Sequence, residues 1–143
     1  PRGPSVNKYR NKLMEEGLNE RVIFKGFIAY DELPVYYNQC DLVVVPSEIY
    51  ESFSYTVAQG MACKKPVIAS NIGGIPETLN DGKAGILFDP GNVEDLNDKI
   101  EFLYLNDSKR KYYAEKAREH VVNNYSLEVL GPKYLSYYKS LIS

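Results

Sequence analysis

Apolar residues along the chain occur either in short unbroken runs or at helical spacing. Unbroken runs at residues 42–47, 66–70 and 85–88 predict strands buried on both faces, because a strand with one wet face alternates apolar and polar residues. A further short strand is predicted at residues 21–27. Helical spacing predicts helices at residues 5–16, 31–39, 52–63, 93–105, 109–123 and 127–142, with a short helix after residue 77. The alternation predicts an α/β fold, a parallel sheet with helices on both faces.

Ligands of such sheets bind beyond the carboxyl ends of the strands. Three connections are predicted to lie at that edge: Gly26 to Tyr30, Pro46 to Ser54 and Ser70 to Glu77. The residues whose chemistry is hardest to explain by packing alone collect in these connections. This edge is therefore where the sequence predicts a binding site.

The connection after the second predicted strand combines a helix start with polar side chains. The first backbone N–H groups of that helix, near Phe53, Ser54 and Tyr55, form an anion site reinforced by the helix dipole. Ser54 can instead cap the helix and occupy those groups itself. Both interpretations of Ser54 stay open at the level of the sequence.

Two further polar residues flank this helix start. Glu51 is either a favourable partner of the helix dipole or an acceptor for sugar hydroxyls. Gln59 lies eight residues later among apolar neighbours, which indicates either a buried hydrogen bond or a contact to a ligand. The pair therefore points to a polar ligand without naming it.

Composition narrows the class of protein. The 143 residues suit one globular domain, and a net charge of −2 argues against a nucleic-acid partner. Cys40 and Cys63 lie in apolar stretches and are predicted to be buried thiols, while His120 has no ligand-type residues at metal-site spacing. No apolar run reaches the roughly 20 residues that span a bilayer. We expect no metal and a cytoplasmic protein, with contact to a membrane surface left open.

Five motifs follow one another in an order that is specific as a set. They are Pro46-Ser47, Glu51-Ser52-Phe53-Ser54, Gly60-Met61-Ala62, Pro66 to Ser70, and Gly73 to Glu77. With them the chain resembles the glycosyl transferases group 1 family, retaining glycosyltransferases built from two Rossmann-like domains (the GT-B architecture). The resemblance runs from Gly3-Pro4 to the last helix, and it implies the doubly wound C-terminal domain that binds the nucleotide sugar.

The resemblance also implies an activity and a set of site residues. A sugar would pass from a nucleotide-diphosphate sugar, the donor substrate, to an acceptor hydroxyl, as in a hexosyltransferase, without a cofactor or a divalent metal. Glu51 would hold hydroxyls of the transferred sugar and is the implied catalytic residue. The remaining donor contacts implied by the family pattern are the base contacts Phe27 and Ile28, the backbone amides of Phe53, Ser54 and Tyr55, and the ribose contact Gln59.

The chain departs from the family pattern in two ways. Gln59 stands where the family has a second glutamate, so a charged acceptor for the ribose is replaced by a neutral amide. The family domain also opens with a strand, a helix and a strand that carry an Arg and a Lys for the diphosphate, and residues 1–143 have no counterpart. We therefore expect a partial domain that is inactive alone. The absent acceptor-binding domain or a second chain would complete the sheet, and membrane contact would lie in the absent domain.

Alternative interpretations follow from the same residues. A degenerate glycosyltransferase or a non-catalytic module that binds a nucleotide sugar is compatible with Gln59. A flavodoxin-like or receiver domain is disfavoured, because its acidic cluster is replaced by Pro46-Ser47 and Ser70-Asn71 at the strand ends. The apolar face of the last helix, residues 127–142, indicates either core packing or an interface.

Overall fold

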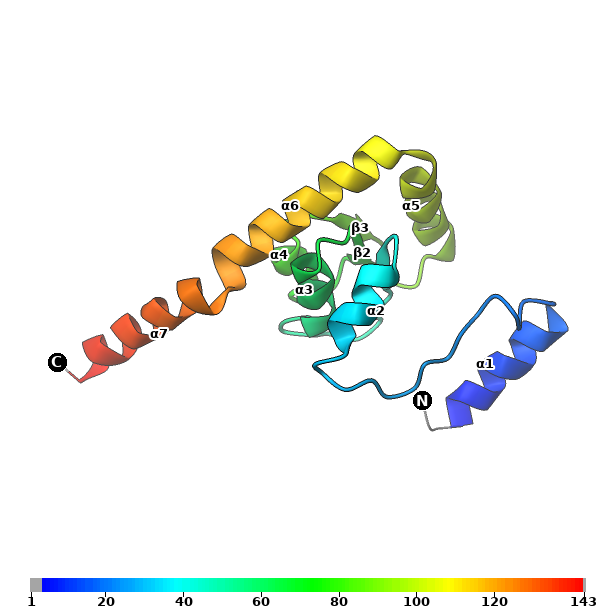
Figure 1. Cartoon of the computed structure of the whole chain (residues 1–143), viewed down its shortest axis with the longest axis horizontal. Helices are drawn as coiled ribbons and strands as arrows, with labels where there is room; N and C mark the ends of the chain where they lie inside the picture. Colours follow the sequence, from blue (N-terminus) through cyan, green and yellow to red (C-terminus); the bar gives the residue numbers. More distant parts are fainter. Residues whose placement is uncertain (1–3, 143) are drawn as a thin grey trace. The chain divides into compact units, whose positions relative to one another are not determined.

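The computed structural model describes residues 4–142 of the chain, and side chains from Val6 onward. The chain divides after Leu33 into two compact units, which are described separately. The first unit contains helix α1 (Pro4–Glu15), and the second contains the sheet and the remaining helices, as Figure 1 shows along the chain. Gly3, where the resemblance to the family begins, lies outside the described residues.

In the first unit, α1 ends close to the predicted position. Gly17 adopts a left-handed φ of +69°, and the N–H of Leu18 donates to the carbonyl of Leu13 at 2.8 Å, which closes the helix. The predicted strand at residues 21–27 is wrong, because this segment forms no strand and pairs with none in the described part of the chain. The guanidinium of Arg10 instead lies 4.8 Å from the ring centre of Phe24.

The second unit is built on a parallel sheet. Its strands β1 (Val43–Val45), β2 (Val67–Ser70) and β3 (Ile86–Phe88) lie in the order β1-β2-β3. Their register pairs Val44 with Ile68 and Ala69 with Leu87. The three buried runs of the sequence thus form strands as predicted. Within the described residues β1 has a strand on one side only.

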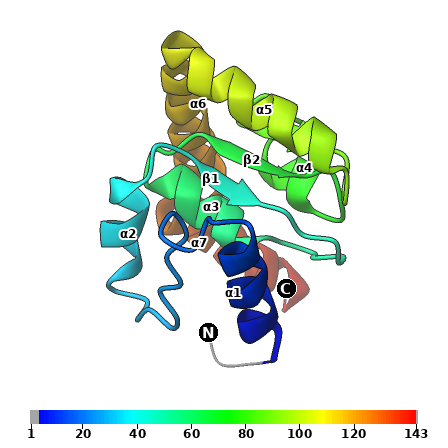
Figure 2. The ribbon, with the colours of Figure 1, turned by 90° about the vertical axis from the view of Figure 1, so that its right-hand side faces the viewer.

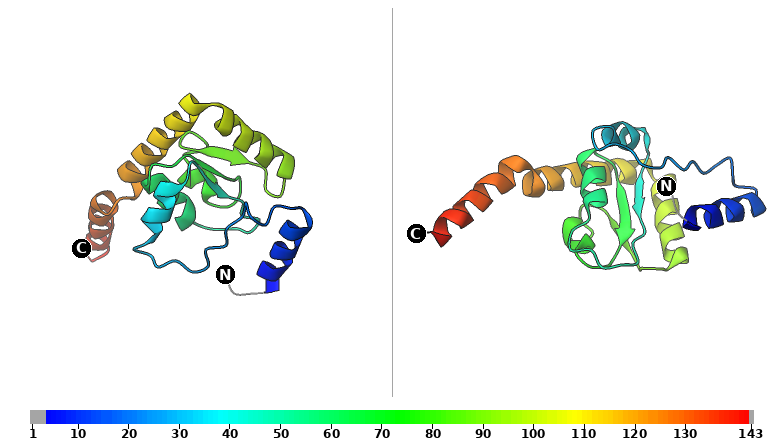
Figure 3. Two further views of the ribbon diagram at one scale, coloured as in Figure 1. Left: turned by 45° about the vertical axis from the view of Figure 1, so that its right-hand side comes forward. Right: turned by 90° about the horizontal axis from the view of Figure 1, so that it is seen from below.

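Helices cover both faces of this sheet. Figures 2 and 3 show α3 (Tyr55–Ala62) on one face and α5 (Val93–Leu105) on the other. Each connection therefore places its helix back against the sheet, which is the α/β layering that the sequence predicts. The short helices α2 (Leu33–Gln39) and α4 (Ile75–Thr78) complete the set before β3.

The sheet separates two hydrophobic clusters. The cluster on the α3 face includes Val57, Met61 and Val67, and the cluster on the α5 face includes Ile68 and Leu103. Successive β2 residues point into opposite clusters, and all four are buried, as expected for a central parallel strand. The central strand is thus the most deeply buried segment of the unit.

Helix α6 (Asp107–Tyr125) joins the two clusters. Ala117 and Val121 are buried in the cluster on the α3 face, and Tyr113 packs against the cluster on the α5 face. Figure 1 shows this long helix passing from α5 to α3 and α4. One helix therefore closes both layers of the core.

The structure decides between the two interpretations of the last helix and overturns the expectation of buried thiols. Helix α7 (Leu127–Leu141) buries none of its described residues, so its apolar face is not core packing here. Cys63 is only half-buried, and Cys40 is exposed. Cys40 follows the short α2 at the surface, where its thiol donates to the carbonyl of Tyr36 at 3.2 Å. Between residues 4 and 142 no helix is long and apolar enough to cross a membrane.

Candidate functional site

Two loops meet at the carboxyl edge of the sheet. The first follows β1 and leads into α3, and the second follows β2 and leads into α4. The backbone N–H of Gly74 donates to the carbonyl of Glu51 at 2.7 Å, so the two loops are bonded directly. The sequence placed both loops at this edge but gave no sign of the bond between them.

Glycine is required for this approach of the loops. A β-carbon on Gly73 would lie 2.5 Å from the carbonyl oxygen of Glu51, and Gly73 has a left-handed φ of +59°. A β-carbon on Gly74 would collide with the carbonyl oxygen of Ser52. The Gly-Gly pair thus fixes the position of the Glu51 backbone.

The carboxylate of Glu51 is held by its own loop. Ser47 Oγ donates to Glu51 Oε1 at 2.6 Å, and the Glu51 side chain is half-buried. The other carboxylate oxygen, Oε2, receives no hydrogen bond from the described side chains. Glu51 therefore presents one oriented acceptor at the strand edge, and Ser47 is a supporting residue that the sequence did not single out.

The start of α3 resolves the question about Ser54. Ser54 occupies the N-cap position and its carbonyl accepts from the N–H of Ala58 at 3.1 Å, but its side chain makes no capping bond. Its exposed fraction is 1%, and its hydroxyl has no hydrogen-bond partner in the described part of the chain. The N–H groups of the first turn, which begins at Tyr55, are therefore left for another acceptor. The helix begins at Tyr55 rather than near Ser52, so the Phe53 N–H belongs to the loop.

Aromatic rings pack together at the loop between β1 and α3. The ring of Phe53 makes edge-on contacts with Tyr55 and Tyr125, each with ring centres 5.3 Å apart. The hydroxyl of Tyr125 donates to the carbonyl of Glu77 at 3.3 Å. Burial and the nearby Glu77 raise the pKa of Tyr125, so its hydroxyl stays protonated at neutral pH. Tyr125 comes from the end of α6 and is a supporting residue that sequence spacing could not assign to this loop.

Of the two contacts predicted for Gln59, the structure shows the hydrogen bond within the protein. The hydroxyl of Tyr37, on α2, donates to Gln59 Oε1 at 3.1 Å. Both side chains are half-buried, and Tyr37 packs against the cluster on the α3 face. The position that departs from the family pattern is therefore already engaged through its oxygen.

The remaining predicted contacts belong to a different part of the chain. Phe27 and Ile28 lie in the first unit, where the Phe27 side chain is 94% exposed and Ile28 is half-buried. Their assignment to the nucleotide base stays a prediction. Glu51, Phe53, Ser54 and Tyr55 lie at the β1–α3 junction, and Gln59 lies one turn further along α3.

The two lysines that follow α3, Lys64 and Lys65, are engaged in contacts away from the β1–α3 junction. Lys64 pairs with Glu115 at 2.6 Å, and Lys65 donates to the carbonyl of Asn38 at 3.0 Å, both at the far end of α3. Neither lysine therefore contributes to the site around Glu51. Across the described residues there is no group of three or more His, Cys, Asp or Glu side chains that could hold a metal ion.

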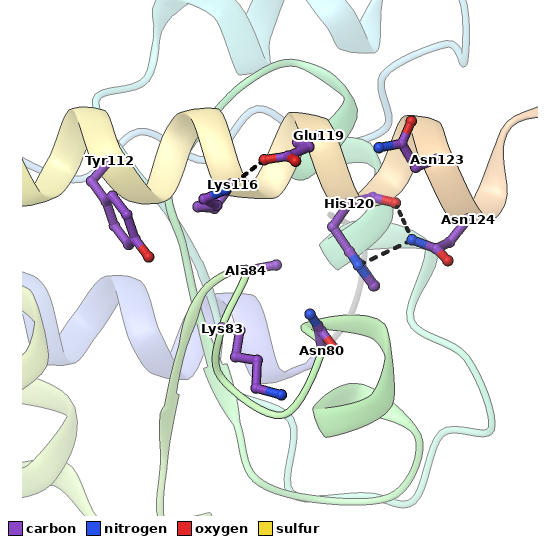
Figure 4. Close-up of a pocket in the computed structure, with 9 residues that line it drawn as sticks. All are labelled: Asn80, Lys83, Ala84, Tyr112, Lys116, Glu119, His120, Asn123 and Asn124. Atoms are coloured by element: carbon purple, nitrogen blue, oxygen red, sulfur yellow. Dashed lines mark hydrogen bonds and ion pairs between the residues drawn. The ribbon is translucent and has the colours of Figure 1, made fainter.

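A separate polar cavity of about 460 Å³ lies between α6 and the turn that precedes β3. Figure 4 shows His120 of α6 pointing toward Asn80 of the turn that precedes β3, while Lys116 lies beside Glu119 on the same helix. Asn124 Nδ2 lies 3.1 Å from His120 Nδ1, and His120 Nε2 is sealed from solvent. None of the predicted donor-site residues lines this cavity, so it is distinct from the β1–α3 junction.

The fold is that of the C-terminal domain of a GT-B glycosyltransferase. Residues 2–120 match the sequence model of the family described as Glycosyl transferases group 1. The chain belongs to this family. Its parallel sheet with helices on both faces corresponds to the C-terminal domain of these proteins.

Particular relatives show how much of such a protein the chain represents. It is 35% identical over 117 residues to an uncharacterized glycosyltransferase of Methanocaldococcus jannaschii, covering 82% of this chain and 33% of that protein. Two solved structures are similar over nearly the whole chain. These are Anabaena HepE in complex with UDP (27% identity, TM-score 0.89, 94% of this chain and 36% of that one) and sucrose-phosphate synthase from Thermosynechococcus elongatus (29%, 0.88, 98% and 35%). The chain spans about a third of the length of each of these relatives.

Proposed function

We propose that this chain is the donor-binding part of a retaining glycosyltransferase that moves a hexose from a nucleotide-diphosphate sugar to an acceptor hydroxyl. The observation that carries the proposal is the β1–α3 junction, where an oriented carboxylate adjoins an uncapped helix start. A carboxylate accepts hydrogen bonds from sugar hydroxyls, and free N–H groups at a helix start donate hydrogen bonds to a phosphate. A diphosphate with a sugar attached combines both features in one ligand.

Each residue of the junction has a role in this proposal. Glu51, oriented by Ser47, holds hydroxyls of the transferred sugar. The backbone N–H groups of Phe53, Ser54 and Tyr55 bind the sugar and the diphosphate, and stabilise the charge that develops on the leaving diphosphate. Gln59 faces the ribose, and Phe27 and Ile28 contact the base. The complex of HepE with UDP supports a uridine nucleotide as the first ligand to test.

The proposal places this chain within a longer protein or an assembly. The chain spans about a third of its relatives, and β1 has a strand on only one side within the described residues. An exposed strand edge is a template for pairing with another strand. We propose that polypeptide outside these residues completes the sheet at β1, supplies the basic residues for the diphosphate and binds the acceptor. The chain alone then binds the donor without turning it over, and needs no cofactor.

Binding of the donor is the direct test. Calorimetric titration with UDP, GDP, ADP and their glucose conjugates should give saturable binding of one nucleotide sugar. Glu51→Ala should weaken that binding on the order of tenfold, because a charge-assisted hydrogen bond is lost. Glu48→Ala, an exposed residue of the same loop, is the matched control and should bind as the parent does. Silence of a folded chain toward all six compounds would contradict the proposal.

A non-catalytic nucleotide-sugar-binding module is the second candidate, and Gln59 is the observation that favours it. Both candidates bind the donor, so turnover must separate them. The full-length protein that contains this segment would be incubated with the bound nucleotide sugar, and release of free nucleoside diphosphate would be followed. Release that depends on Glu51 identifies the transferase, whereas tight binding without release identifies the module.

A further inference from the structure

The hydrogen bond between Tyr37 and Gln59 has a direction. The phenol hydroxyl is the donor and Gln59 Oε1 is the acceptor, at 3.1 Å. The two residues are 22 positions apart and lie on different helices, α2 and α3. A side-chain amide has one acceptor oxygen and one NH₂ donor group. The contact with Tyr37 therefore decides which end of the amide is engaged.

Tyr37 is well suited to hold that orientation. Its ring packs against the cluster on the α3 face, which limits the movement of the hydroxyl. Burial raises the pKa of Tyr37, and the nearby Cys63 and Cys40 thiols act in the same direction. The hydroxyl therefore keeps its proton at neutral pH and remains available to donate to Gln59 Oε1, as it does in the structure.

The opposite end of the amide stays unengaged. Gln59 Nε2 has no acceptor among the described side chains and carbonyls, although Oε1 is bonded. With the oxygen directed at Tyr37, the NH₂ group is turned away from Tyr37. A glutamate at this position would behave differently, since one oxygen could accept from Tyr37 and the other from a ligand hydroxyl.

We propose that Tyr37 is a positioning residue that holds the Gln59 amide with its NH₂ group toward the nucleotide, so that the site donates to a ribose oxygen. The inference rests on the proposed function, in which Gln59 faces the ribose. It assigns the site a donor where a glutamate would offer an acceptor. The ribose hydroxyl then accepts a hydrogen bond from the Gln59 NH₂ group, and its own proton is left to donate to another acceptor.

The test measures how much the ribose hydroxyls contribute to binding. Of UDP, GDP and ADP, the one that binds most tightly is titrated calorimetrically together with its 2′-deoxy and 3′-deoxy analogues. Each analogue lacks one ribose hydroxyl and should bind more weakly than the nucleotide. We define the ribose contribution as the larger of these two losses of affinity, and it should be about fivefold in the parent chain. Tyr37→Phe and Gln59→Leu should each reduce it below about twofold, while the conservative Tyr104→Phe, an exposed residue of α5, should leave it unchanged.

Gln59→Glu is a second variant that keeps an acceptor for Tyr37. Because a carboxylate turns a charged oxygen to the ribose, the nucleotide should bind more tightly and the ribose contribution should rise above its value in the parent chain. This variant also retains the contact between α2 and α3. Thermal unfolding of every variant, followed by circular dichroism, separates a change in ribose recognition from a loss of the fold.

The outcomes distinguish this inference from the proposed function. If no diphosphate binds a folded parent chain, the proposed function is wrong and the inference falls with it. If a nucleotide binds but Tyr37→Phe keeps the full ribose contribution, the inference alone is overturned and the bond is a structural link between α2 and α3. An unchanged ribose contribution in Gln59→Glu would overturn it equally.

Discussion

The carbonyl oxygen of Glu51 accepts a hydrogen bond of 2.7 Å from the backbone N–H of Gly74. The bond joins the loop that carries the candidate catalytic carboxylate to the loop that precedes α4. Because both partners are backbone groups, the geometry depends on the absence of side chains at the Gly-Gly pair and not on any particular side chain. The site is therefore sensitive to substitutions that add a single carbon atom.

The first prediction concerns Gly74→Ala. The added β-carbon would collide with the carbonyl of Ser52, so the loops must separate, at a cost of about 1–3 kcal/mol in the free energy of unfolding. Donor binding should weaken at the same time, because Glu51 moves with its loop. Urea unfolding and calorimetry measure the two effects. Gly131→Ala, whose β-carbon in α7 would meet no atom within 4 Å apart from its chain neighbours, should lower the free energy of unfolding less and leave donor binding unchanged; equal behaviour of the two variants would contradict the prediction.

The second prediction concerns Ser47→Ala. Loss of the 2.6 Å bond to Glu51 Oε1 leaves the carboxylate in place but without a fixed orientation. The affinity for a nucleotide sugar should fall about three- to tenfold, and the affinity for the corresponding nucleoside diphosphate should not change. Ser52→Ala, an exposed serine of the same loop, serves as the control. An equal loss of both affinities would show that Ser47 acts on the loop as a whole.

The third prediction separates a true helix cap from an apparent one. Ser54→Ala should leave the free energy of unfolding unchanged or raise it, because a buried hydroxyl without a partner is itself destabilising. Asn92→Ala should lower it by about 1 kcal/mol, since Asn92 Oδ1 accepts from the Asp95 N–H at 3.0 Å at the start of α5. Thermal unfolding of both variants checks the difference. A comparable loss for Ser54→Ala would mean that its hydroxyl does cap α3.

The fourth prediction concerns pH and His120, the single histidine of the chain. Burial lowers the pKa of His120 below its ordinary value of 6.5, so the folded chain binds a proton there less readily than the unfolded chain. Stability from this group is present above pH 6.5 and is lost as the pH falls toward the folded-state pKa. Urea unfolding between pH 7.5 and 5.5 should show the decline, and His120→Gln should reduce it. The same decline in both proteins would exclude His120 as its source.

The sequence predicted those elements whose signal is local. The strands β1, β2 and β3 were predicted because burial on both faces leaves an unbroken apolar run, and the Gly-Gly loop because few other residues fit such a turn. The segment at residues 21–27 has strand-like composition as well. Its failure to form a strand within the described residues shows that composition alone does not decide the outcome, because a strand also needs a pairing partner.

The supporting contacts of the site could not be predicted in the same way. Tyr37 and Gln59 are 22 positions apart, and Phe53 meets Tyr125 only because α6 returns across the α3 face. Such contacts depend on how helices cross, which residue spacing does not encode. Whether Ser54 caps its helix was likewise open, because the same residue types serve as caps and as uncapped helix starts.

The position of α6 has a consequence for how the second unit opens. Because this one helix is packed against both hydrophobic clusters, detaching it exposes the two faces of the sheet together. Amide protons of β2 should then exchange with solvent only through an opening that also releases α3 and α5, at the rate of the slowest exchanging group in the unit. The sheet edge that carries Glu51 therefore belongs to a unit that unfolds in a single cooperative transition.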